Sequence, residues 1–401
     1  MRGNKKRKEE AAYLIFAGPT MMRRRQQYGV GYSFLACLFL LRIRLHFGSA
    51  FNAPSSRRKF VQSSLTIPAL VSAPSPSAAD DNGPLVIPLK YVPALSAYVV
   101  SYSVGGDKLG AIVDTGSPFL LVPSYCDENR YGCYRPEASE SSGLDKTYER
   151  FDSNEGMVEW RRAPFSFQQA SFGGSNDVEK EFFPAPMVFG VLSESLMDGP
   201  GGIFLGLVKN TDTRIRPSFL GQSNVRAFSI DLREERDPKT LSLSKGNDDW
   251  IKDDWIQLNG VKALQKGGDP TRHYSAEALE VSVNGKPLIA PNAKGKKKKT
   301  IVIFDTGVSG MVICPDLFEQ RYQTARVNRQ KSLWGQVDVG FRTQLGEKVT
   351  LSATKPLTTP FGSDRPWDKP FDAHLIVVGL AFLDNKKTTI DIDNERLWIE
   401  S

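Results

Sequence analysis

Two aspartates with the same neighbours are the residues in this sequence best suited to chemistry. Asp-Thr-Gly occurs at Asp114 and again at Asp305, 191 residues later. A single copy is a common turn sequence and would carry little weight. If the fold brings both aspartates together, like charges that close cannot both ionise, and the two carboxyl groups share one proton. The ionised carboxylate can then take a proton from water while the protonated one polarises an amide carbonyl, which hydrolyses the amide without a metal or a covalent intermediate.

The residues that follow each aspartate are expected to support the two carboxylates. Glycine lets the backbone approach closely, and the short hydroxyl of threonine lies beside the carboxylate. The supporting residues predicted in this way are Thr115, Gly116, Ser117, Thr306 and Gly307.

Other hydrolytic chemistries have little support in the sequence. Only His273 and His374 lie beyond the first 79 residues, and neither is close in sequence to a cluster with metal-ligand spacing. No Gly-x-Ser-x-Gly sequence is present to supply a serine nucleophile. We therefore expect no metal and no cofactor.

The elements that must position the aspartates are predicted to be strands. Short apolar segments alternate with Gly, Pro, Asn and Asp, for example Leu85 to Leu89, Tyr98 to Val104 and Ala111 to Val113. Helical periodicity is weak, with short candidates near Arg216 to Leu220 and Pro315 to Tyr322. The sequence predicts a mainly β protein.

An internal echo predicts two related halves. Ala111 to Ser117 recurs as Ile301 to Val308. Each Asp-Thr-Gly is also followed downstream by two apolar residues and a glycine. These second segments are Phe204-Leu205-Gly206 and Val377-Val378-Gly379.

The charge distribution argues against nucleic-acid binding. The 401 residues carry a net charge of +7, but residues 1–79 hold 13 basic and 2 acidic residues. The remaining residues hold 39 basic and 43 acidic residues, so the body of the chain is mildly acidic. We expect no nucleic-acid partner.

Residues 1–79 have the features of a targeting leader. Tyr28 to Leu41 is an apolar run after three arginines, long enough for a signal-peptide core and short for a membrane span. The following Gly48 to Pro54 resembles the cleavage motif of diatom-type plastid signals, and Ser56 to Val61 resembles a twin-arginine export motif. Together they predict a signal peptide to about residue 50, then a transit segment, and delivery to the thylakoid lumen of a plastid. The alternative is an ordinary secretory signal leading to a vacuolar or extracellular location, and in either case we expect no membrane span in the mature protein.

The four cysteines predict one disulfide. Cys37 lies in the leader, Cys126 and Cys133 are close together, and Cys314 is left over. A disulfide between Cys126 and Cys133 would place the protein in an oxidising compartment.

These features together resemble the pepsin family of aspartic peptidases over nearly all of residues 85–401. Asp114 to Ser124 resembles the first catalytic strand of that family, and Cys126 with Cys133 matches its small disulfide loop. Further segments follow the family order: Pro200 to Leu207, Ala227 to Leu232, Ala278 to Pro287, Phe304 to Gly310, Val377 to Leu383 and Thr388 to Trp398.

The resemblance implies a bilobal fold and a proteolytic activity. The fold would have two pseudo-twofold-related, β-barrel-like lobes, an N-terminal lobe at 85–232 and a C-terminal lobe at 233–401, with the active-site cleft between them. The activity would be that of an aspartic endopeptidase acting on polypeptide substrates, as a monomer and without a cofactor. Sharing of one proton by the two aspartates is an established property of this family. The resemblance therefore implies it for Asp114 and Asp305.

The sequence departs from the family in ways that affect the expected activity. Val308 stands where Thr or Ser is usual, and loss of that hydroxyl donor would raise the pKa of Asp305 and shift activity toward less acidic pH. Leu121 stands where many members have a tryptophan that partners the tyrosine of the flap, the hairpin covering the cleft. Tyr148 is the candidate flap tyrosine, and Trp160 is the other aromatic that could cover the cleft, although each could equally be an ordinary half-buried strand residue.

Two further expectations concern regulation and function. Between Ala79 and Leu85 there is no room for an inhibitory pro-segment, so we expect pH to gate activity through the proton-sharing pair. The family also contains catalytically silent members, so the alternative to a peptidase is a pepsin-like binding or inhibitor protein.

Overall fold

A computed structural model of the protein describes residues 83–124, 126, 131–151, 154–168, 183, 186–192, 203–210, 217–246, 250, 252–259, 272–288, 298–318, 334–361 and 373–401. The expected leader, residues 1–79, lies outside these described residues. The compact unit that contains them all extends from Ser75 to Ser401.

The described part of the chain is mainly β, as the sequence predicts. Its helices are short: α5 (Leu380–Leu383), the 3-10 helices η1 (Pro136–Ala138) and η2 (Leu220–Gln222), and helical residues 315–318. The expected helix at 315–322 is confirmed as far as residue 318, and the rest lies outside the described residues. The helix expected near 216–220 is instead the 3-10 turn η2, which begins at the end of that range.

A ten-stranded sheet contains the strand that ends at Asp114. Its order is β10 (Phe204–Gly206), β3 (Asp107–Asp114), β2 (Ala97–Val104), β1 (Leu85–Val92), β12 (Lys239–Ser244), β11 (Ala227–Asp231), β23 (Lys387–Asp391), β24 (Arg396–Glu400) and β13 (Ile256–Gln257), with β8 (Phe165–Phe167) paired to β2. The sheet combines strands from both halves of the chain, since β1 and β11 each pair antiparallel with β12. The boundary expected after residue 232 therefore falls between two neighbouring strands of one sheet.

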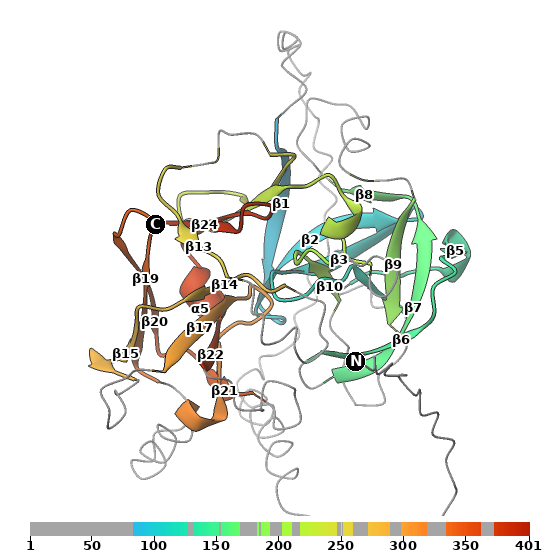
Figure 1. Ribbon diagram of the computed structural model, residues 1–401. Helices are drawn as coiled ribbons and strands as arrows, with labels where there is room; N and C mark the ends of the chain where they lie inside the picture. Colours follow the sequence, from blue (N-terminus) through green and yellow to red (C-terminus); the bar gives the residue numbers. More distant parts are fainter. Residues whose placement is uncertain are drawn as a thin grey trace, which may run out of the picture. The chain divides into compact units, whose positions relative to one another are not determined.

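A five-stranded sheet contains the strand that leads to Asp305. Its order is β14 (Ser275–Glu277), β17 (Lys299–Phe304), β22 (Ala373–Val378), β18 (Met311–Ile313) and β21 (Thr358–Pro360). β17 and β22 are parallel and lie side by side in Figure 1. A separate antiparallel sheet follows the order β16 (Lys286–Pro287), β15 (Glu280–Val283), β19 (Gln336–Arg342) and β20 (Lys348–Thr354).

The fourth sheet lies in the first half of the chain. Its order is β4 (Leu121–Pro123), β9 (Met187–Leu192), β7 (Asn154–Ala163) and β5 (Glu140–Ser141), with β6 (Thr147–Phe151) paired to β7. β6 and β7 form an antiparallel hairpin, and β7 lies beside β9 (Figure 1). Three of the four sheets contain parallel pairs, and none of them closes into a barrel within the described residues.

Burial explains why these segments form strands. In β1 the buried residues Leu85, Ile87 and Leu89 alternate with more exposed ones, which is the period of a strand with one face on the core. The last four residues of β3 are all buried, as are the last three of β17, because both strands have neighbours on each side. The two strands that lead to the aspartates are thus held inside the main hydrophobic core.

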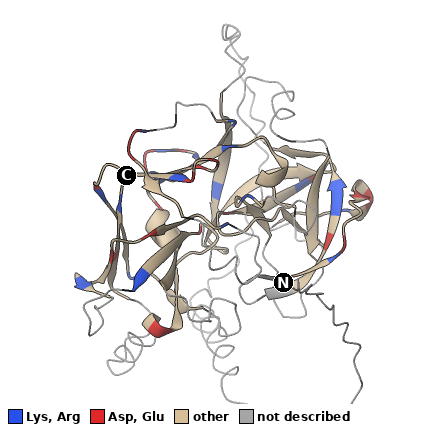
Figure 2. Ribbon diagram, viewed as in Figure 1, with Lys and Arg blue, Asp and Glu red and all other residues tan. Residues whose placement is uncertain are grey.

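The charged residues are scattered over the described strands. Figure 2 shows Lys and Arg interspersed with Asp and Glu, with neither sign forming a continuous face in that view. Among the residues that the structure describes, no helix is long and apolar enough to cross a bilayer.

Candidate active site

Each aspartate lies where a buried strand ends beside a parallel neighbour. Asp114 is the last residue of β3, and its carbonyl oxygen accepts a hydrogen bond of 2.7 Å from the Leu207 amide just beyond β10. Asp305 directly follows β17, and its amide donates to the Val378 carbonyl oxygen at the end of β22, at 3.0 Å. The second part of the sequence echo, which ends in Gly206 or Gly379, therefore runs alongside the aspartate strand in both halves.

The backbone after each aspartate turns back toward its carboxylate. The Gly116 amide donates to Asp114 Oδ1 at 2.7 Å, and the Gly307 amide donates to Asp305 Oδ1 at 2.8 Å. Such bonds favour the charged form of a carboxyl group. Both copies of the motif thus form the same local structure.

The two carboxyl groups meet, and each lies against the glycine of the other copy. A side-chain carbon added at Gly307 would lie 2.7 Å from the carboxyl carbon of Asp114, and one added at Gly116 would collide with the carboxyl group of Asp305. The two carboxyl groups are also hydrogen-bonded to each other. Only glycine leaves room for this approach at either position.

The two threonines join the strand ends by a reciprocal set of hydrogen bonds. The Thr115 amide donates to Thr306 Oγ1 at 3.2 Å, and the Thr306 amide donates to Thr115 Oγ1 at 3.0 Å. Each hydroxyl in turn donates to a backbone carbonyl of the opposite copy: Thr115 to Phe304 at 2.9 Å and Thr306 to Val113 at 2.7 Å. Each hydrogen bond made by Thr115 has an equivalent bond made by Thr306. Both threonine side chains are buried.

Burial and mutual repulsion make the pair hold a proton. Burial raises the pKa of Asp114 well above its ordinary value, and the neighbouring charge of Asp305 raises it further. Burial also raises the pKa of Asp305, while the hydrogen bonds from Asp114 and from the Gly307 amide oppose that rise. The two groups therefore titrate as a unit that holds one proton between them.

Ser117 and Val308 occupy equivalent places with different side-chain chemistry. The backbone amide of Ser117 donates to Asp114, and that of Val308 donates to Asp305. The Ser117 hydroxyl accepts a hydrogen bond of 3.2 Å from the Phe119 amide, whereas the Val308 side chain packs against an apolar cluster that includes Ile303. The predicted effect of Val308 on the pKa of Asp305 stays a prediction.

His273 is a neighbour of the pair that the sequence analysis did not place at the site. In the antiparallel β14–β17 ladder Ser275 pairs with Ile303, and the Phe304 amide donates to the Tyr274 carbonyl oxygen at 3.0 Å. Extending this register by one step sets His273 opposite Asp305. A positive charge on His273 lowers the pKa of Asp305, in opposition to the larger effect of burial. Only strand register reveals this neighbour, because His273 is 32 residues from Asp305 in the sequence.

The two aromatic residues considered as cleft covers have different environments. Trp160 is 1% exposed, its ring lies 6.1 Å from that of Phe119, and its Nε1 donates to Thr147 Oγ1 at 3.1 Å. The expectation that Trp160 could cover the cleft is therefore wrong, because it fills a core cluster that also contains Leu121. Tyr148 is 54% exposed on β6, one residue from Thr147, and stays the candidate flap residue.

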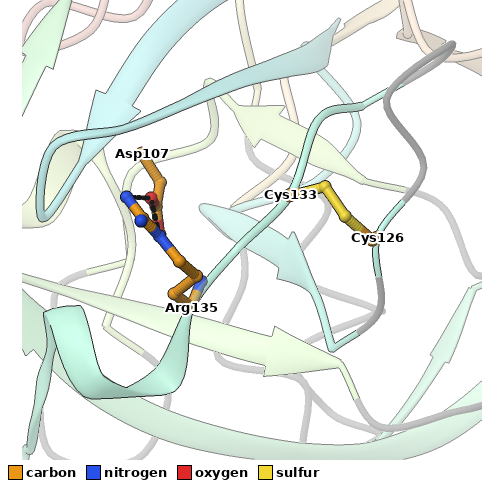
Figure 3. The surroundings of a disulfide bond; sticks show 4 residues. All are labelled: Asp107, Cys126, Cys133 and Arg135. Carbon is orange, nitrogen blue, oxygen red and sulfur yellow. Dashed lines mark hydrogen bonds and ion pairs between the residues drawn. A yellow bond between two sulfur atoms is a disulfide. The ribbon is translucent and has the colours of Figure 1, made fainter.

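The predicted disulfide is confirmed. Cys126 and Cys133 are bonded to each other in the segment that follows β4 (Figure 3). Close to it, Asp107 at the start of β3 accepts hydrogen bonds of 2.7 Å from both the backbone amide and the Nε of Arg135. Because Asp107 is buried, this charge-assisted pair ties the disulfide segment to the strand that ends at Asp114.

Comparison with known protein families finds no matching family model, and no curated protein is significantly similar to the chain in sequence. Function must therefore be inferred from the chemistry of the site itself.

Proposed function

We propose that the protein is an aspartic endopeptidase of the pepsin type, in which Asp114 and Asp305 share one proton and activate a water molecule for peptide-bond hydrolysis. The observation that carries the proposal is the reciprocal contact of the two carboxyl groups, each lying against the glycine of the other copy. An isolated buried aspartate is most simply explained as a structural residue. Two buried aspartates in mutual contact destabilise the fold wherever both would ionise, because like charges in a low-dielectric site repel each other, so stability at neutral pH does not explain their contact.

The roles of the two carboxyl groups follow from their surroundings. Asp114, whose pKa is raised well above the ordinary value by burial and by Asp305, holds the proton and donates it toward the scissile carbonyl oxygen. Asp305 accepts a hydrogen bond from Asp114 and acts as the base that removes a proton from the attacking water. The water oxygen adds to the carbonyl carbon and gives a tetrahedral intermediate with two hydroxyl groups. As its C–N bond breaks, Asp305 passes the proton taken from water to the leaving amine, and one hydroxyl returns a proton to Asp114, which restores the pair with a single proton.

The proposed architecture has an N-terminal lobe at 85–232 and a C-terminal lobe at 233–401, with the cleft between them at the two aspartates. The exchange of hydrogen bonds between Thr115 and Thr306 supports a pseudo-twofold relation of the two halves. The β6–β7 hairpin, with Tyr148 exposed on it, is the proposed flap.

The test is the rate of peptide hydrolysis against pH for the full-length chain and for Asp114→Asn and Asp305→Asn. Each substitution should lower the rate by about 10² to 10⁴-fold, the usual contribution of a general acid or base. Asp338→Asn is the matched control, because it changes the same side chain on β19 of a different sheet and should leave the rate unchanged. Circular dichroism of all variants confirms that they are folded. Full activity in either aspartate variant would refute the proposal.

A folded wild-type protein that cleaves no peptide between acid and neutral pH would favour the alternative of a pepsin-like binding or inhibitor protein. Binding of a pepstatin-like inhibitor, which mimics the tetrahedral transition state, separates the two functions. If the pair is catalytic, the wild-type protein should bind the inhibitor and the Asp114→Asn variant should not.

The motifs of residues 1–79 support the further proposal that the mature protein works in the thylakoid lumen. A fluorescent protein fused to these residues should reach the lumen when expressed in a diatom. Replacing Arg57 and Arg58 by lysine should stop the fusion at the thylakoid membrane, whereas export from the cell would support a secretory location.

A further inference from the structure

A cluster of three different ligand-type side chains lies on the sheet that carries Asp305. Cys314 directly follows β18, Asp316 belongs to helical residues 315–318, and His374 is in β22. Cys314 Sγ is 3.7 Å from His374 Nδ1, and the same nitrogen is 3.1 Å from Asp316 Oδ2. Their ligand atoms all lie within 4.8 Å of one another.

The separations match those of ligands around one tetrahedral zinc ion. With usual zinc–ligand bond lengths and tetrahedral angles, a sulfur and a nitrogen ligand lie about 3.6 Å apart, and a nitrogen and an oxygen ligand about 3.3 Å apart. The observed distances of 3.7 and 3.1 Å are close to both values. A metal ion could therefore be accepted with only small side-chain movements.

The backbone holds the three residues in place without the metal. The Cys314 amide donates to the Leu375 carbonyl oxygen at 2.9 Å, which fixes the end of β18 beside β22. The Phe318 amide donates to the Cys314 carbonyl oxygen at 3.1 Å, which closes the helical turn that carries Asp316. The ligands thus come from a rigid sheet and from one turn fixed to it, which is the arrangement expected of a preorganised site.

We propose that Cys314, Asp316 and His374 form a zinc site, with solvent in the fourth coordination position. A thiolate together with an imidazole selects zinc over the hard cations Mg²⁺ and Ca²⁺, which prefer oxygen ligands only. His374 is buried, whereas the side chain of Asp316 is 51% exposed, so the site is open to solvent on the carboxylate side.

The ionisation of the thiol links metal binding to proton release. Burial, with a smaller effect of Asp316, raises the pKa of Cys314 to about 12, so the thiol is protonated in the metal-free protein and is not a nucleophile. Zinc binding replaces that proton, which passes to solvent. The positive charge of the nearby Lys298 lowers the pKa of both Asp316 and His374. The same charge would repel a bound metal ion.

The site would act as a clamp within the second half of the chain. His374 lies four residues before Val378, about 13 Å along β22 from the backbone beside Asp305. The metal would join β22, the end of β18 and the helical turn, so it would stabilise the sheet that supports Asp305. The proposal does not depend on peptidase activity.

The test measures binding of Co²⁺ and Zn²⁺ to the full-length chain at neutral pH, in a Cys37→Ser background so that Cys314 is the one thiol outside the disulfide. Cobalt should give the intense visible bands of tetrahedral coordination and a near-ultraviolet thiolate-to-cobalt charge-transfer band, and one equivalent of zinc should remove both. Cys314→Ser should abolish the charge-transfer band.

Two further variants test whether the carboxylate of Asp316 binds the metal. Asp316→Asn changes an exposed side chain and should fold, yet it should lower the affinity for zinc by at least about tenfold. Glu347→Gln, which changes an exposed acid in the β19–β20 turn, is the control and should bind zinc like the background protein. Zinc should also raise the melting temperature of the background protein and of Glu347→Gln, and raise that of Asp316→Asn less.

Binding that is equally tight in Cys314→Ser, or a cobalt spectrum without the charge-transfer band, would overturn the proposal. The cluster would then be an ion pair of Asp316 and His374 beside a buried thiol.

Discussion

At the scale of single residues, the contact between Asp114 and Asp305 makes the stability of the fold depend on pH. Burial raises the pKa of Asp114, so the folded protein binds this proton more tightly than the unfolded chain does. Its contribution to stability is complete below the ordinary carboxyl pKa of about 4 and is lost as the pH rises through the raised value. Asp114 therefore lowers the free energy of unfolding increasingly as the pH rises toward neutral.

Asp114→Asn should accordingly stabilise the protein at neutral pH while lowering the rate of hydrolysis by about 10² to 10⁴-fold. Because asparagine does not ionise, the free energy of unfolding of the variant relative to wild type should rise between pH 4 and pH 7, by about 1.4 kcal/mol for each pH unit of the pKa difference that is traversed. Thermal denaturation at several pH values measures the effect.

Asp338→Asn is the matched comparison and should show the opposite trend. Hydrogen bonds from Gln336 and Ser352 lower the pKa of Asp338, so its stabilising effect is present above the ordinary carboxyl pKa and is lost as the pH falls. A melting-temperature difference for Asp114→Asn that does not change with pH would show that its pKa is not raised.

Two neighbours of Asp305 should shift the pH profile of hydrolysis in opposite directions. Val308→Thr supplies a hydroxyl donor to the carboxylate, lowers its pKa and should move the acid limb to lower pH. His273→Asn removes a positive charge that lowers the pKa of Asp305, and should move that limb to higher pH. We expect each shift to be below about one pH unit. Profiles of kcat/KM for the two variants measure this, and shifts in the same direction would contradict it.

At the scale of the elements, the threonine hydrogen bonds hold the ends of β3 and β17 together. Thr306 Oγ1 accepts from the Thr115 amide and donates to the Val113 carbonyl oxygen. Thr306→Val keeps the shape of the side chain but leaves both of these buried groups without a partner, which costs about 1 to 3 kcal/mol for each group. We expect a loss of about 2 to 6 kcal/mol in the free energy of unfolding.

Thr306→Ser is the control for this effect, because it retains the hydroxyl and removes only a methyl group. It should lose about 1 kcal/mol and keep most of the activity. Urea denaturation of both variants gives the comparison, and equal destabilisation would show that the threonine is needed for packing and not for its hydrogen bonds.

At the scale of the whole molecule, the ten-stranded sheet makes the two halves depend on each other. A cut after residue 232 would separate β12 from both of its neighbours, β1 and β11, and would also separate β11 from β23. Unpaired edges of buried strands leave backbone groups unsatisfied.

Fragments 75–232 and 233–401 should therefore not fold when each is produced alone, and should regain structure when mixed. Circular dichroism and gel filtration of the separate and mixed fragments test this. A cooperative unfolding transition in either fragment alone would show that the half is an independent domain.

The sequence alone determined the features that depend on local pattern. Short apolar segments separated by Gly, Pro, Asn and Asp identified strands such as 85–89 and 98–104, because strands need apolar residues for the core and turns need residues that end them. The two copies of Asp-Thr-Gly indicated the two aspartates whose carboxyl groups meet in the structure. The short spacing of Cys126 and Cys133 indicated the disulfide.

Only the tertiary structure decided which distant residues meet. It brought the carboxyl group of each aspartate onto the glycine of the other copy, set His273 opposite Asp305, and buried Trp160 in the core. It also gathered Cys314 and His374, 60 residues apart, into one cluster. These contacts depend on strand order and register across the sheets, which are set by the packing of the whole core and have no local signature in the sequence.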